Sequence, residues 1–476
     1  MQASTSALRP LCVDLDGTLV KTDLLYESVL ELVRCSPWIL FILPFWLLRG
    51  KAYLKAEVAS RVDFTARSLP VNADVASYIQ AQRGMRKTYL VSGSHYSLVQ
   101  AVAANVALFD GAKGSDHQTN LTGHRKRDWL ISEFGEAGFD YIGNDLDDIK
   151  VWSAAKESLA VSTPDGIATT AGIEFSHVFD MPTPGLRDYL KLMRIHQWLK
   201  NLLILVPFFL AQRLGDPEAA LSIVLAFFAM SLLASATYIT NDMLDLQSDR
   251  ENLNKSNRPL ASGQISIAAG LQLATVLLVA VVIISLALPL AFNIMLGVYL
   301  ASTLCYSFFL KRKAIIDVIT LASLHTLRVI AGTVAIQAQW SFWLLAFSMF
   351  IFFSLAMAKR VAELKNLMKS GRTDTIGRDY HVDDIPVLLS MGVSSGTAAV
   401  LVIALYINGE KVQRLYESPF YLWLICPIMM YWITYVWIKT SRGLMNEDPL
   451  VFAVSNRTSQ GLAICAFLAV VCAMML

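Results

Sequence analysis

The stretch from Asn241 to Asp249 carries four side chains with hard oxygen ligands directly after a long apolar segment. Asn241, Asp245 and Asp249 are spaced at i, i+4 and i+8, so on a continuous helix they lie along one stripe, with Asp242 three residues before Asp245. Carboxylates at membrane depth are costly unless paired, and they suit Mg²⁺ shared with substrate phosphates. We predict that these four residues bind Mg²⁺ against a diphosphate and that Asp245 is catalytic; the alternative is a solvated helix end in a polar loop.

Basic side chains in three further segments are candidates for binding phosphates. Arg258 follows the acidic stretch, and Arg can clamp phosphate oxygens bidentately. Lys359 and Arg360 end a later apolar segment, where cations suit a second phosphate; the alternative is that they only anchor the helix at the membrane surface. Arg328 lies inside another apolar segment, which makes it a functional candidate, whereas we interpret His325 as a core histidine.

A second pair of carboxylates lies near the N-terminus, in the sequence Asp14-Leu15-Asp16-Gly17-Thr18. This pair follows a short apolar run, and alternation along an extended chain places Asp14 and Asp16 on the same side. Both can therefore lie near one Mg²⁺. The pair is a second candidate metal site, far in sequence from the first.

The elements that must position Asp14 and Asp16 alternate between strand-like and helical patterns. The strand-like runs are residues 8–16, 88–92, 106–109 and 139–143. This order predicts an α/β domain with a parallel sheet. The apolar run Ser36–Leu48 is too short to span a bilayer, which requires about 20 residues. It is either a buried cap helix or a helix that lies on the membrane surface.

The composition divides the chain into two kinds of region. Hydrophobic residues make up 55% of the 476 residues and charged residues 16%, where about 25% is usual in a soluble domain. From about residue 198, long apolar stretches alternate with short polar loops, and we count nine spans, the first at 198–213. The predicted domains are 1–180 with a helical cap, a Pro-containing linker at 181–188, and an all-α polytopic membrane domain at 189–476.

The distribution of charge predicts where the chain resides. A net charge of +2 argues against a nucleic-acid partner. Lys and Arg concentrate in the loops after the even-numbered spans, so the positive-inside rule places these loops in the cytosol. Residues 1–11 lack the pattern of a signal peptide, and the six cysteines show no zinc-ligand spacing. We expect a multi-pass protein of a bacterial inner membrane with a cytosolic N-terminal domain.

The pattern NDxxDxxxDR at 241–250, followed by NRPLASG at 257–263, resembles the first motif of the UbiA superfamily of intramembrane prenyltransferases. This resemblance covers about residues 185–476 and implies nine helices with a cytosolic-side site. The segment from Arg194 to Asn201 is similar to the RxxQWxKN opening of the decaprenyl-phosphate phosphoribosyltransferase branch, as are Asp317-Val318, Arg328 and the Lys359–Glu363 segment. It implies that Arg194, Lys200 and Asn201 bind substrate.

That branch moves phosphoribose from phosphoribosyl diphosphate to a polyprenyl phosphate. Aromatic prenyltransferases carry a second aspartate-rich motif after the sixth span, where this chain has Lys359, Arg360 and Glu363. We therefore predict Mg²⁺-dependent transfer of 5-phosphoribose to a polyprenyl phosphate within membrane lipid. The alternatives are prenyl transfer from a polyprenyl diphosphate to an aromatic or lipid-like acceptor, a transporter, and a phosphatase anchored by non-catalytic helices.

The DxDGT motif resembles the haloacid dehalogenase (HAD) superfamily of phosphatases over about residues 8–165. The resemblance implies that Asp14 attacks phosphorus, that Asp16 is the acid and base, and that Asp14, Asp16 and Asp148 hold Mg²⁺. It also implies that Ser92 binds phosphate and that Lys126 balances charge. The family usually has Asp where Asn144 stands, so the alternative is a fold-retaining domain with weak or no catalysis. An active domain is expected to remove the 5-phosphate of the transferase product.

Overall fold

The structure is a computed structural model that describes residues 8–62, 66–162, 172–252, 255–369, 378–445 and 448–475. Its contacts divide the chain into two compact units. The first, here called the α/β unit, comprises Met1–Met193 and Tyr238–Ala274. The second, the helical unit, comprises Arg194–Thr237 and Thr275–Leu476. The acidic stretch at 241–249 therefore belongs, by its contacts, to the unit that contains Asp14.

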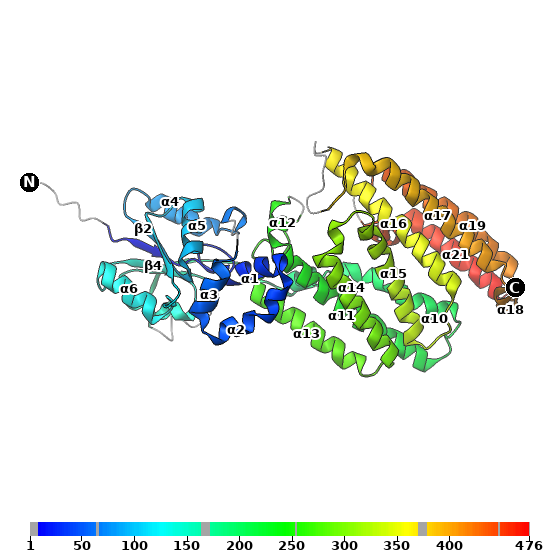
Figure 1. The fold of residues 1–476 in the computed structure, drawn as a ribbon, viewed down its shortest axis with the longest axis horizontal. Helices are drawn as coiled ribbons and strands as arrows, with labels where there is room; N and C mark the ends of the chain where they lie inside the picture. The colour runs from blue at the N-terminus through cyan, green and yellow to red at the C-terminus, as the bar shows by residue number, and fades with distance from the viewer. Residues whose placement is uncertain are drawn as a thin grey trace, which may run out of the picture. The chain divides into compact units, whose positions relative to one another are not determined.

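The α/β unit is built on one six-stranded parallel sheet with the order β3-β2-β1-β4-β5-β6 (Figure 1). The strands are β1 (Leu11–Val13), β2 (Thr88–His95), β3 (Gly111–Ser115), β4 (Asp140–Gly143), β5 (Ser158–Val161) and β6 (Phe175–Phe179). The sequence prediction of a parallel sheet is confirmed. The predicted strand at 106–109 is wrong, because α5 (Tyr96–Val106) ends there with Ala107 in a left-handed conformation. Strands β3, β5 and β6 lie outside every run that the sequence predicted as a strand.

Alternate residues of the central strand serve two cores, as the pleat requires. Leu11 and Val13 join a cluster with residues of α4 and α5 on one face of the sheet, and Cys12 joins a cluster with residues of α6 and α7 on the other. Helices therefore cover both faces. The helices of this unit, besides α5, are α1 (Leu24–Cys35), α2 (Leu43–Leu48), α3 (Lys51–Ala59), α4 (Ala73–Gln82), α6 (His124–Phe134), α7 (Ile149–Trp152), α9 (Leu186–Leu192) and α12 (Leu246–Glu251).

The run Ser36–Leu48 forms a 3₁₀ turn, η1 (Pro37–Phe41), and the short helix α2. With α1 and α3 it makes a cap whose small core contains Trp46, whereas Trp38, Phe41, Phe45 and Leu48 are exposed. The run is therefore a cap helix that is buried on one side only, where Trp46 reaches that core.

Parallel pairing brings the carboxyl ends of β1, β2 and β4 to one edge of the sheet. Leu11 lies opposite Thr88 on one neighbour and Asp140 on the other, so the loops that follow these strands meet. Gly17 has φ 74° in the turn after β1, and a Cβ there would lie 2.2 Å from Asn144 Nδ2. A side chain other than Gly would therefore displace the loop after β4.

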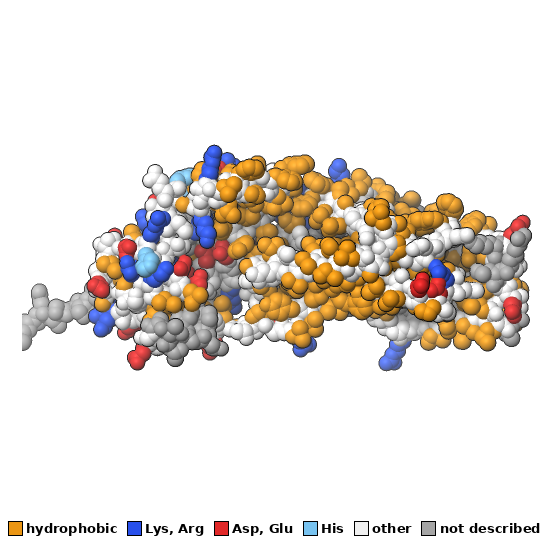
Figure 2. Space-filling view, turned by 90° about the horizontal axis from the view of Figure 1, so that it is seen from below, with side chains coloured by type: hydrophobic (Ala, Val, Ile, Leu, Met, Phe, Trp, Pro, Cys, Tyr) orange, Lys and Arg blue, Asp and Glu red, His pale blue; other side chains and the backbone are white. Residues whose placement is uncertain are grey.

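The helical unit consists of apolar helices, two of which, α11 and α13, continue into the α/β unit. Eight helices of the described chain are long and apolar enough to cross a membrane: α11 (Pro217–Leu244), α13 (Ile267–Ser285), α14 (Leu290–Phe308), α15 (Ile316–Ala335), α16 (Phe342–Lys369), α17 (Ile385–Ile407, extended by the 3₁₀ turn η6, Val382–Asp384), α19 (Ile425–Ser441, extended by η7, Pro419–Leu424) and α21 (Arg457–Met475). Figure 2 shows hydrophobic side chains spread over its visible face. The chain is an integral multi-pass membrane protein.

The first of the nine predicted spans is displaced along the chain and divided into two short helices. Residues 198–213 were expected to cross the membrane, but the apolar helical segment, of the same length, runs from Ile195 to Leu210. It consists of the 3₁₀ helix η4 (Ile195–Leu205) and the short α10 (Val206–Leu210), with Pro207 in the first turn of α10. The segment has 16 residues, which is fewer than the about 20 that a full span requires. The remaining short helices are η5 (Leu310–Arg312), α18 (Glu410–Leu415) and α20 (Pro449–Ser455).

The helices of this unit pack around two apolar clusters that both include residues of α15. Close approach to η4 requires a residue without a side chain on α15. Gly332 meets this need, because a Cβ at that position would lie 2.0 Å from the carbonyl oxygen of Ile204. Backbone cannot yield as a flexible side chain can, so the size of Gly332 fixes how η4 lies on α15.

We predict that Gly332→Ala lowers the thermal unfolding temperature of the purified protein, because overpacking costs about 1–3 kcal/mol. Gly297→Ala on α14 is the matched control, since a Cβ there meets nothing within 4 Å. Ala stabilises a helix by up to about 1 kcal/mol relative to Gly, so the control is expected to be neutral or stabilising. Equal unfolding temperatures for the two variants would contradict the proposed contact.

Candidate active sites

The DxDGT motif lies in a buried ionic network at the edge of the sheet. Lys126 Nζ on α6 donates to Asp14 Oδ1 at 2.8 Å and to Asp148 Oδ1 at 3.2 Å. Tyr141 hydroxyl lies 2.8 Å from the same ammonium and donates to Asp148 Oδ1 at 2.7 Å. The structure thus brings together three predicted residues, Asp14, Lys126 and Asp148, and adds Tyr141, which sequence reasoning missed because it lies inside β4.

Asp16 is held separately by hydroxyls of β2 and by the cap. Its Oδ2 accepts from Ser92 Oγ at 3.0 Å and Ser94 Oγ at 2.7 Å, and its Oδ1 accepts from Leu24 N at 2.8 Å. Ser92, predicted to bind phosphate, therefore contacts the predicted acid and base. Because Leu24 begins α1, the position of Asp16 depends on the cap as well as on the sheet.

Burial and charge act in opposite directions on the pKa values of this network. Burial raises the pKa of Asp14 to about 7, although Lys126 opposes the shift. Burial lowers the pKa of Lys126, but the carboxylates of Asp14 and Asp148 outweigh it and the net shift is upward. Lys126 therefore stays charged at neutral pH, while Asp14 exchanges its proton near pH 7.

Asn144 stands where the resemblance to HAD phosphatases implied an acidic metal ligand. Its Oδ1 accepts from Thr18 Oγ1 at 3.0 Å, and its backbone N–H donates to Asp148 Oδ2 at 3.0 Å. Asp145 Oδ1 accepts from Leu146 N at 2.6 Å, as a helix cap does. Within the described residues, no three His, Cys, Asp or Glu side chains are arranged as a metal site. The carboxylates at this edge fit Mg²⁺ in kind, but Asn144 removes one charged ligand.

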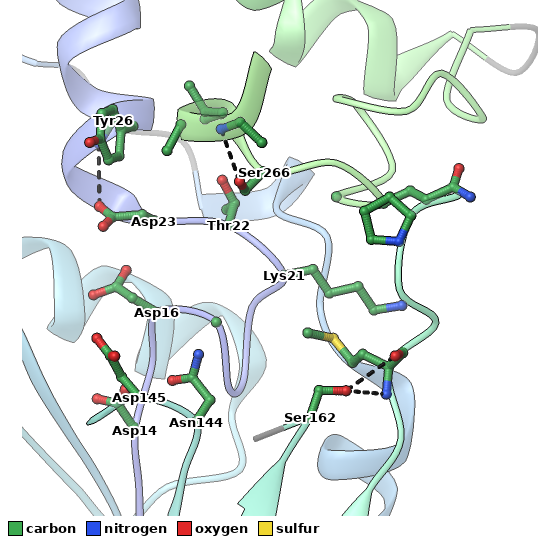
Figure 3. Close-up of a pocket in the computed structure, with 18 of the residues that line it drawn as sticks. Asp14, Asp16, Lys21, Thr22, Asp23, Tyr26, Asn144, Asp145, Ser162 and Ser266 are labelled. Atoms are coloured by element: carbon green, nitrogen blue, oxygen red, sulfur yellow. Dashed lines mark hydrogen bonds between the residues drawn. The ribbon is translucent and has the colours of Figure 1, made fainter. Parts of the chain in front are cut away.

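This site opens into a cavity of about 1000 Å³ within the α/β unit (Figure 3). Figure 3 shows Asp14, Asp16, Asn144 and Asp145 on one side and Ser266 on another. The remaining walls come from the linker, from α9 and from the segment before α13: Pro182, Thr183, Pro184, Tyr189, Lys191, Asn257, Ser262, Gly263 and Gln264. The phosphatase-like site therefore faces the segment that follows the acidic stretch.

The acidic stretch keeps helical backbone hydrogen bonds, with a local interruption at Asp245. Helix α11 ends at Leu244, and Asp245 has φ −101° and ψ 12° before α12 begins at Leu246. Asp245 N still donates to Asn241 O at 3.0 Å and Asp249 N to Asp245 O at 2.8 Å, as in a continuous helix. Asn241 Nδ2 lies 3.2 Å from Asp245 Oδ2, so these two predicted ligands are neighbours.

Arg258 instead brings Asp242 and Asp249 together. Its Nη1 donates to Asp242 Oδ1 at 3.0 Å and to Asp249 Oδ2 at 2.5 Å, and both carboxylates are buried. Lys255 Nζ lies 3.6 Å from the other oxygen of Asp249. Two carboxylates that converge on one guanidinium nitrogen can also converge on a divalent cation, so this pair fits Mg²⁺. The arrangement favours Asp242 and Asp249 over Asp245 as its ligands.

Two predicted phosphate-binding lysines of the helical unit share a carboxylate that sequence reasoning missed. Lys200 Nζ donates to Asp448 Oδ2 at 2.7 Å, and Lys359 Nζ donates to the same oxygen at 3.0 Å. Burial raises the pKa of Asp448, but the two lysines outweigh burial and hold it well below its usual value. Asp448 lies before α20, far in sequence from both lysines, and no motif marked it.

Arg328 and Asn201 also lie together, as their shared resemblance to one family implied. Arg328 Nε donates to Asn201 Oδ1 at 2.8 Å, Nη2 donates to Tyr299 hydroxyl at 2.7 Å, and Nη1 donates to Leu324 O at 2.7 Å. His325 Nδ1 lies 3.5 Å from Nη1. These contacts join η4, α14 and α15 around a buried guanidinium, so Arg328 orients Asn201 beside Lys200.

Arg360 pairs with two acids, whereas Lys359 shares the single acid Asp448 with Lys200. Its guanidinium donates to both oxygens of Asp317, at 2.5 and 3.0 Å, and to Glu363. Arg360 is buried, whereas the side chain of Lys359 is 32% exposed. Lys359 is therefore the better candidate for phosphate. Arg194, the remaining predicted residue, is half-buried at the start of η4 with φ 51°.

The UbiA prenyltransferase family model matches residues 202–474, which is more than half of the chain. The chain belongs to the UbiA prenyltransferase family. An uncharacterized protein of Sinorhizobium fredii, y4nM, is 37% identical over 94% of this chain and 88% of its own length. The decaprenyl-phosphate phosphoribosyltransferase of Mycolicibacterium smegmatis is 35% identical, over 38% of this chain and 58% of its own.

Two solved structures resemble separate parts of this UbiA-family chain. A UbiA homologue from Archaeoglobus fulgidus bound to GPP and Mg²⁺ is 18% identical, covering 60% of this chain and 99% of its own, with a TM-score of 0.45. A phosphoserine phosphatase, described as a phospho-aspartyl intermediate analogue, is 15% identical, covering 38% and 97%, with a TM-score of 0.27.

We predict that Asn144→Asp lowers the Mg²⁺ concentration for half-maximal hydrolysis of p-nitrophenyl phosphate by about an order of magnitude, because metal affinity follows the number of charged ligands. The substituted carboxylate keeps the oxygen that accepts from Thr18. Asp147→Asn is the matched control, since Asp147 lies in the same loop and is largely exposed. An unchanged Mg²⁺ dependence in Asn144→Asp would contradict the assignment of this loop as a metal ligand.

Proposed function

We propose that this UbiA-family transferase moves 5-phosphoribose from phosphoribosyl diphosphate to a polyprenyl phosphate. The observation that carries the proposal is the cluster in which Lys200 and Lys359 share Asp448. Lys359 lies in the segment in which the aromatic prenyltransferases carry acidic residues, and cations there suit a phosphate acceptor. The relative named decaprenyl-phosphate phosphoribosyltransferase, which this chain matches over 58% of that protein's length, supports the same chemistry.

Asp242 and Asp249 are the residues we assign to Mg²⁺, with Asn241 and Asp245 beside them. A bound Mg²⁺ would neutralise the charge that develops on a departing diphosphate. Arg258 donates to both carboxylates and can also bind phosphate oxygens bidentately, so it is assigned to the same diphosphate. Asp245 is the residue that joins α11, which carries Asp242, to α12, which carries Asp249.

The acceptor is a lipid phosphate, which we assign to Lys200 and Lys359. An oxygen of this phosphate attacks the anomeric carbon, the bond from that carbon to the diphosphate breaks, and the diphosphate leaves with the electron pair. Asn201 and Arg328 position Lys200, Arg194 is assigned to the same phosphate, and Arg360, neutralised by Asp317 and Glu363, supports Lys359 on α16. The prenyl tail lies between apolar helices in contact with membrane lipid.

The α/β unit is proposed to act next, on the 5-phosphate that the product carries. Asp14 would attack phosphorus, forming an aspartyl phosphate, while Asp16 protonates the leaving ribose oxygen; water, deprotonated by Asp16, then releases phosphate. Ser92 and Lys126 hold the phosphate, and Asp148 with Asp14 and Asp16 would hold Mg²⁺. The supporting observation is the cavity, because residues of the transferase motif region line the phosphatase-like site.

The proposed placement is a bacterial inner membrane with the N-terminal domain in the cytosol. The proposed division is a HAD-like domain at 1–180, a linker at 181–188 and the transferase domain at 189–476. Both placements follow from charge and composition. A cytosolic phosphatase-like domain would meet a product whose ribose phosphate faces the same side.

The proposal is tested by labelled substrates in two parallel reactions with Mg²⁺. One contains radiolabelled phosphoribosyl diphosphate and polyprenyl phosphate, and the other contains radiolabelled prenyl diphosphate and 4-hydroxybenzoate. In the first reaction, label is expected to pass from phosphoribosyl diphosphate to the polyprenyl phosphate. In the second, no label is expected to pass from prenyl diphosphate to 4-hydroxybenzoate. Label in 4-hydroxybenzoate would instead support prenyl transfer, and release of phosphate without any labelled lipid product would support an anchored phosphatase. Asp14→Asn is expected to leave the lipid product phosphorylated, whereas equal phosphate release would exclude the α/β unit.

Asp249→Asn is expected to reduce transfer about a hundredfold or more, since metal stabilisation of a leaving group amounts to several kcal/mol. Glu251→Gln is the matched control, because Glu251 ends the same short helix and is exposed. Hydrolysis of p-nitrophenyl phosphate by both variants shows whether the α/β unit is folded. Transfer by Asp249→Asn at the level of Glu251→Gln would remove the acidic stretch from the mechanism.

A further inference from the structure

The cap of the α/β unit carries a stripe of large apolar side chains that the proposed chemistry does not use. Trp38, Phe41, Phe45 and Leu48 are spaced at three, four and three residues, and they are 74, 70, 68 and 85% exposed. Figure 1 places α2, which carries the second half of this stripe, beside α1 and α3. This spacing puts the four side chains on one side of the turn and helix. The cap stripe, as we call these four residues, is therefore directed away from the cap core.

The opposite side of the same segment is the side that packs. Trp46 is buried against Leu32, Leu54 and Val58, and Leu43 is partly buried against the same cluster. The cap thus has a complete small core without the cap stripe. Exposed side chains of this size are not needed for folding, and a contiguous apolar surface of this kind usually marks a binding surface.

The charged residues nearest in sequence to the cap stripe are positive. No acidic residue occurs from Ser36 to Ala56, while Arg49 and Lys51 follow the stripe and are exposed. Aromatic and leucine side chains on one side, with Arg and Lys at the border, are typical of helices that lie in the interface of an anionic membrane. The combination of an apolar stripe with a basic border therefore matches the acyl boundary and the anionic head groups of a phospholipid surface.

A buried ion pair ties the cap to the segment between α11 and α13. Arg250 Nη2 lies 2.5 Å from Glu27 Oε1 of α1, and Nη1 lies 3.1 Å from Glu27 Oε2. Both side chains are only 6% exposed, and Arg250 Nε also donates to Ala261 O. Arg250 belongs to the segment between α11 and α13, which are both long and apolar enough to cross the membrane. Helix α1 is thus tied to the segment that joins those two helices.

We propose that the cap stripe inserts into the interfacial layer of the same bilayer that α11 and α13 cross, with phospholipid as its occupant. The α1 helix, tied by Glu27, leads directly through Ser36 into the cap stripe, so the stripe needs no separate tether. Insertion would hold the cavity beside Asp16 at the head-group layer. The inference does not depend on which reaction either site performs.

The test replaces single residues by the photoreactive amino acid p-benzoyl-phenylalanine in the full chain. Variants at Phe41 and Leu48 report on the two ends of the cap stripe, and a variant at Met85 is the control, because Met85 is 59% exposed but lies in the loop between α4 and β2. Each variant is reconstituted into vesicles of phosphatidylethanolamine and phosphatidylglycerol and then illuminated. Mass spectrometry of the labelled peptides measures covalent phospholipid adducts.

Phospholipid adducts at positions 41 and 48 are expected to exceed those at position 85 several-fold. Two results would overturn the proposal: adduct levels equal to the control, or crosslinks at positions 41 and 48 that join only a second copy of the chain. Two reporter positions keep the test decisive should one substitution disturb the cap. Thermal unfolding of each variant identifies such a disturbance.

Discussion

The need to neutralise carboxylates at the end of a membrane-crossing helix governs the arrangement of the acidic stretch. Asp242 and Asp249 are buried, and Arg258 donates to both from one nitrogen. Two buried anions at this distance would repel one another strongly without a cation. The guanidinium of Arg258 therefore holds the two carboxylates together. Asp249 reaches this guanidinium from α12, which begins directly after Asp245.

The acidic stretch and the site around Asp14 both depend on contacts within the α/β unit. The segment 238–274 packs with the sheet domain, Arg250 is paired with Glu27, and the cavity beside Asp14 is lined by residues that follow the acidic stretch. The loop after the sheet strand and the loop after the membrane helix are thus positioned by the same unit. A product formed at one site has a phosphatase-like site within the same structural unit.

Sequence reasoning succeeded where local pattern determines structure. Alternating apolar runs predicted the parallel sheet, and the DxDGT motif predicted that Asp14, Lys126 and Asp148 meet, as they do. Long apolar segments predicted the membrane helices, whereas the first predicted span corresponds to the 3₁₀ helix η4 and the short α10. Helical spacing predicted that Asn241 and Asp245 are neighbours, but it did not predict that Asp242 and Asp249 converge on Arg258.

Contacts between distant segments could not be predicted in this way. Asp448 joins Lys200 and Lys359 across 248 and 89 residues, and no local pattern near Asp448 indicates either partner. The pairing of Arg360 with Asp317 likewise depends on how α15 and α16 pack. These contacts change the assignment of phosphate ligands, because they favour Lys359 and leave Arg360 neutralised by Asp317 and Glu363.

We propose that Asp242 and Asp249 bind a divalent cation in place of Arg258 when Arg258 engages a diphosphate. Electron paramagnetic resonance of Mn²⁺, which substitutes for Mg²⁺, measures this directly in the Asp14→Asn background, where the other candidate site is impaired. We expect Mn²⁺ uptake to rise when inorganic diphosphate is added, and we expect Asp249→Asn to abolish this rise while Glu251→Gln retains it. Undiminished diphosphate-dependent Mn²⁺ uptake in Asp249→Asn would show that Asp249 is not a ligand of the cation.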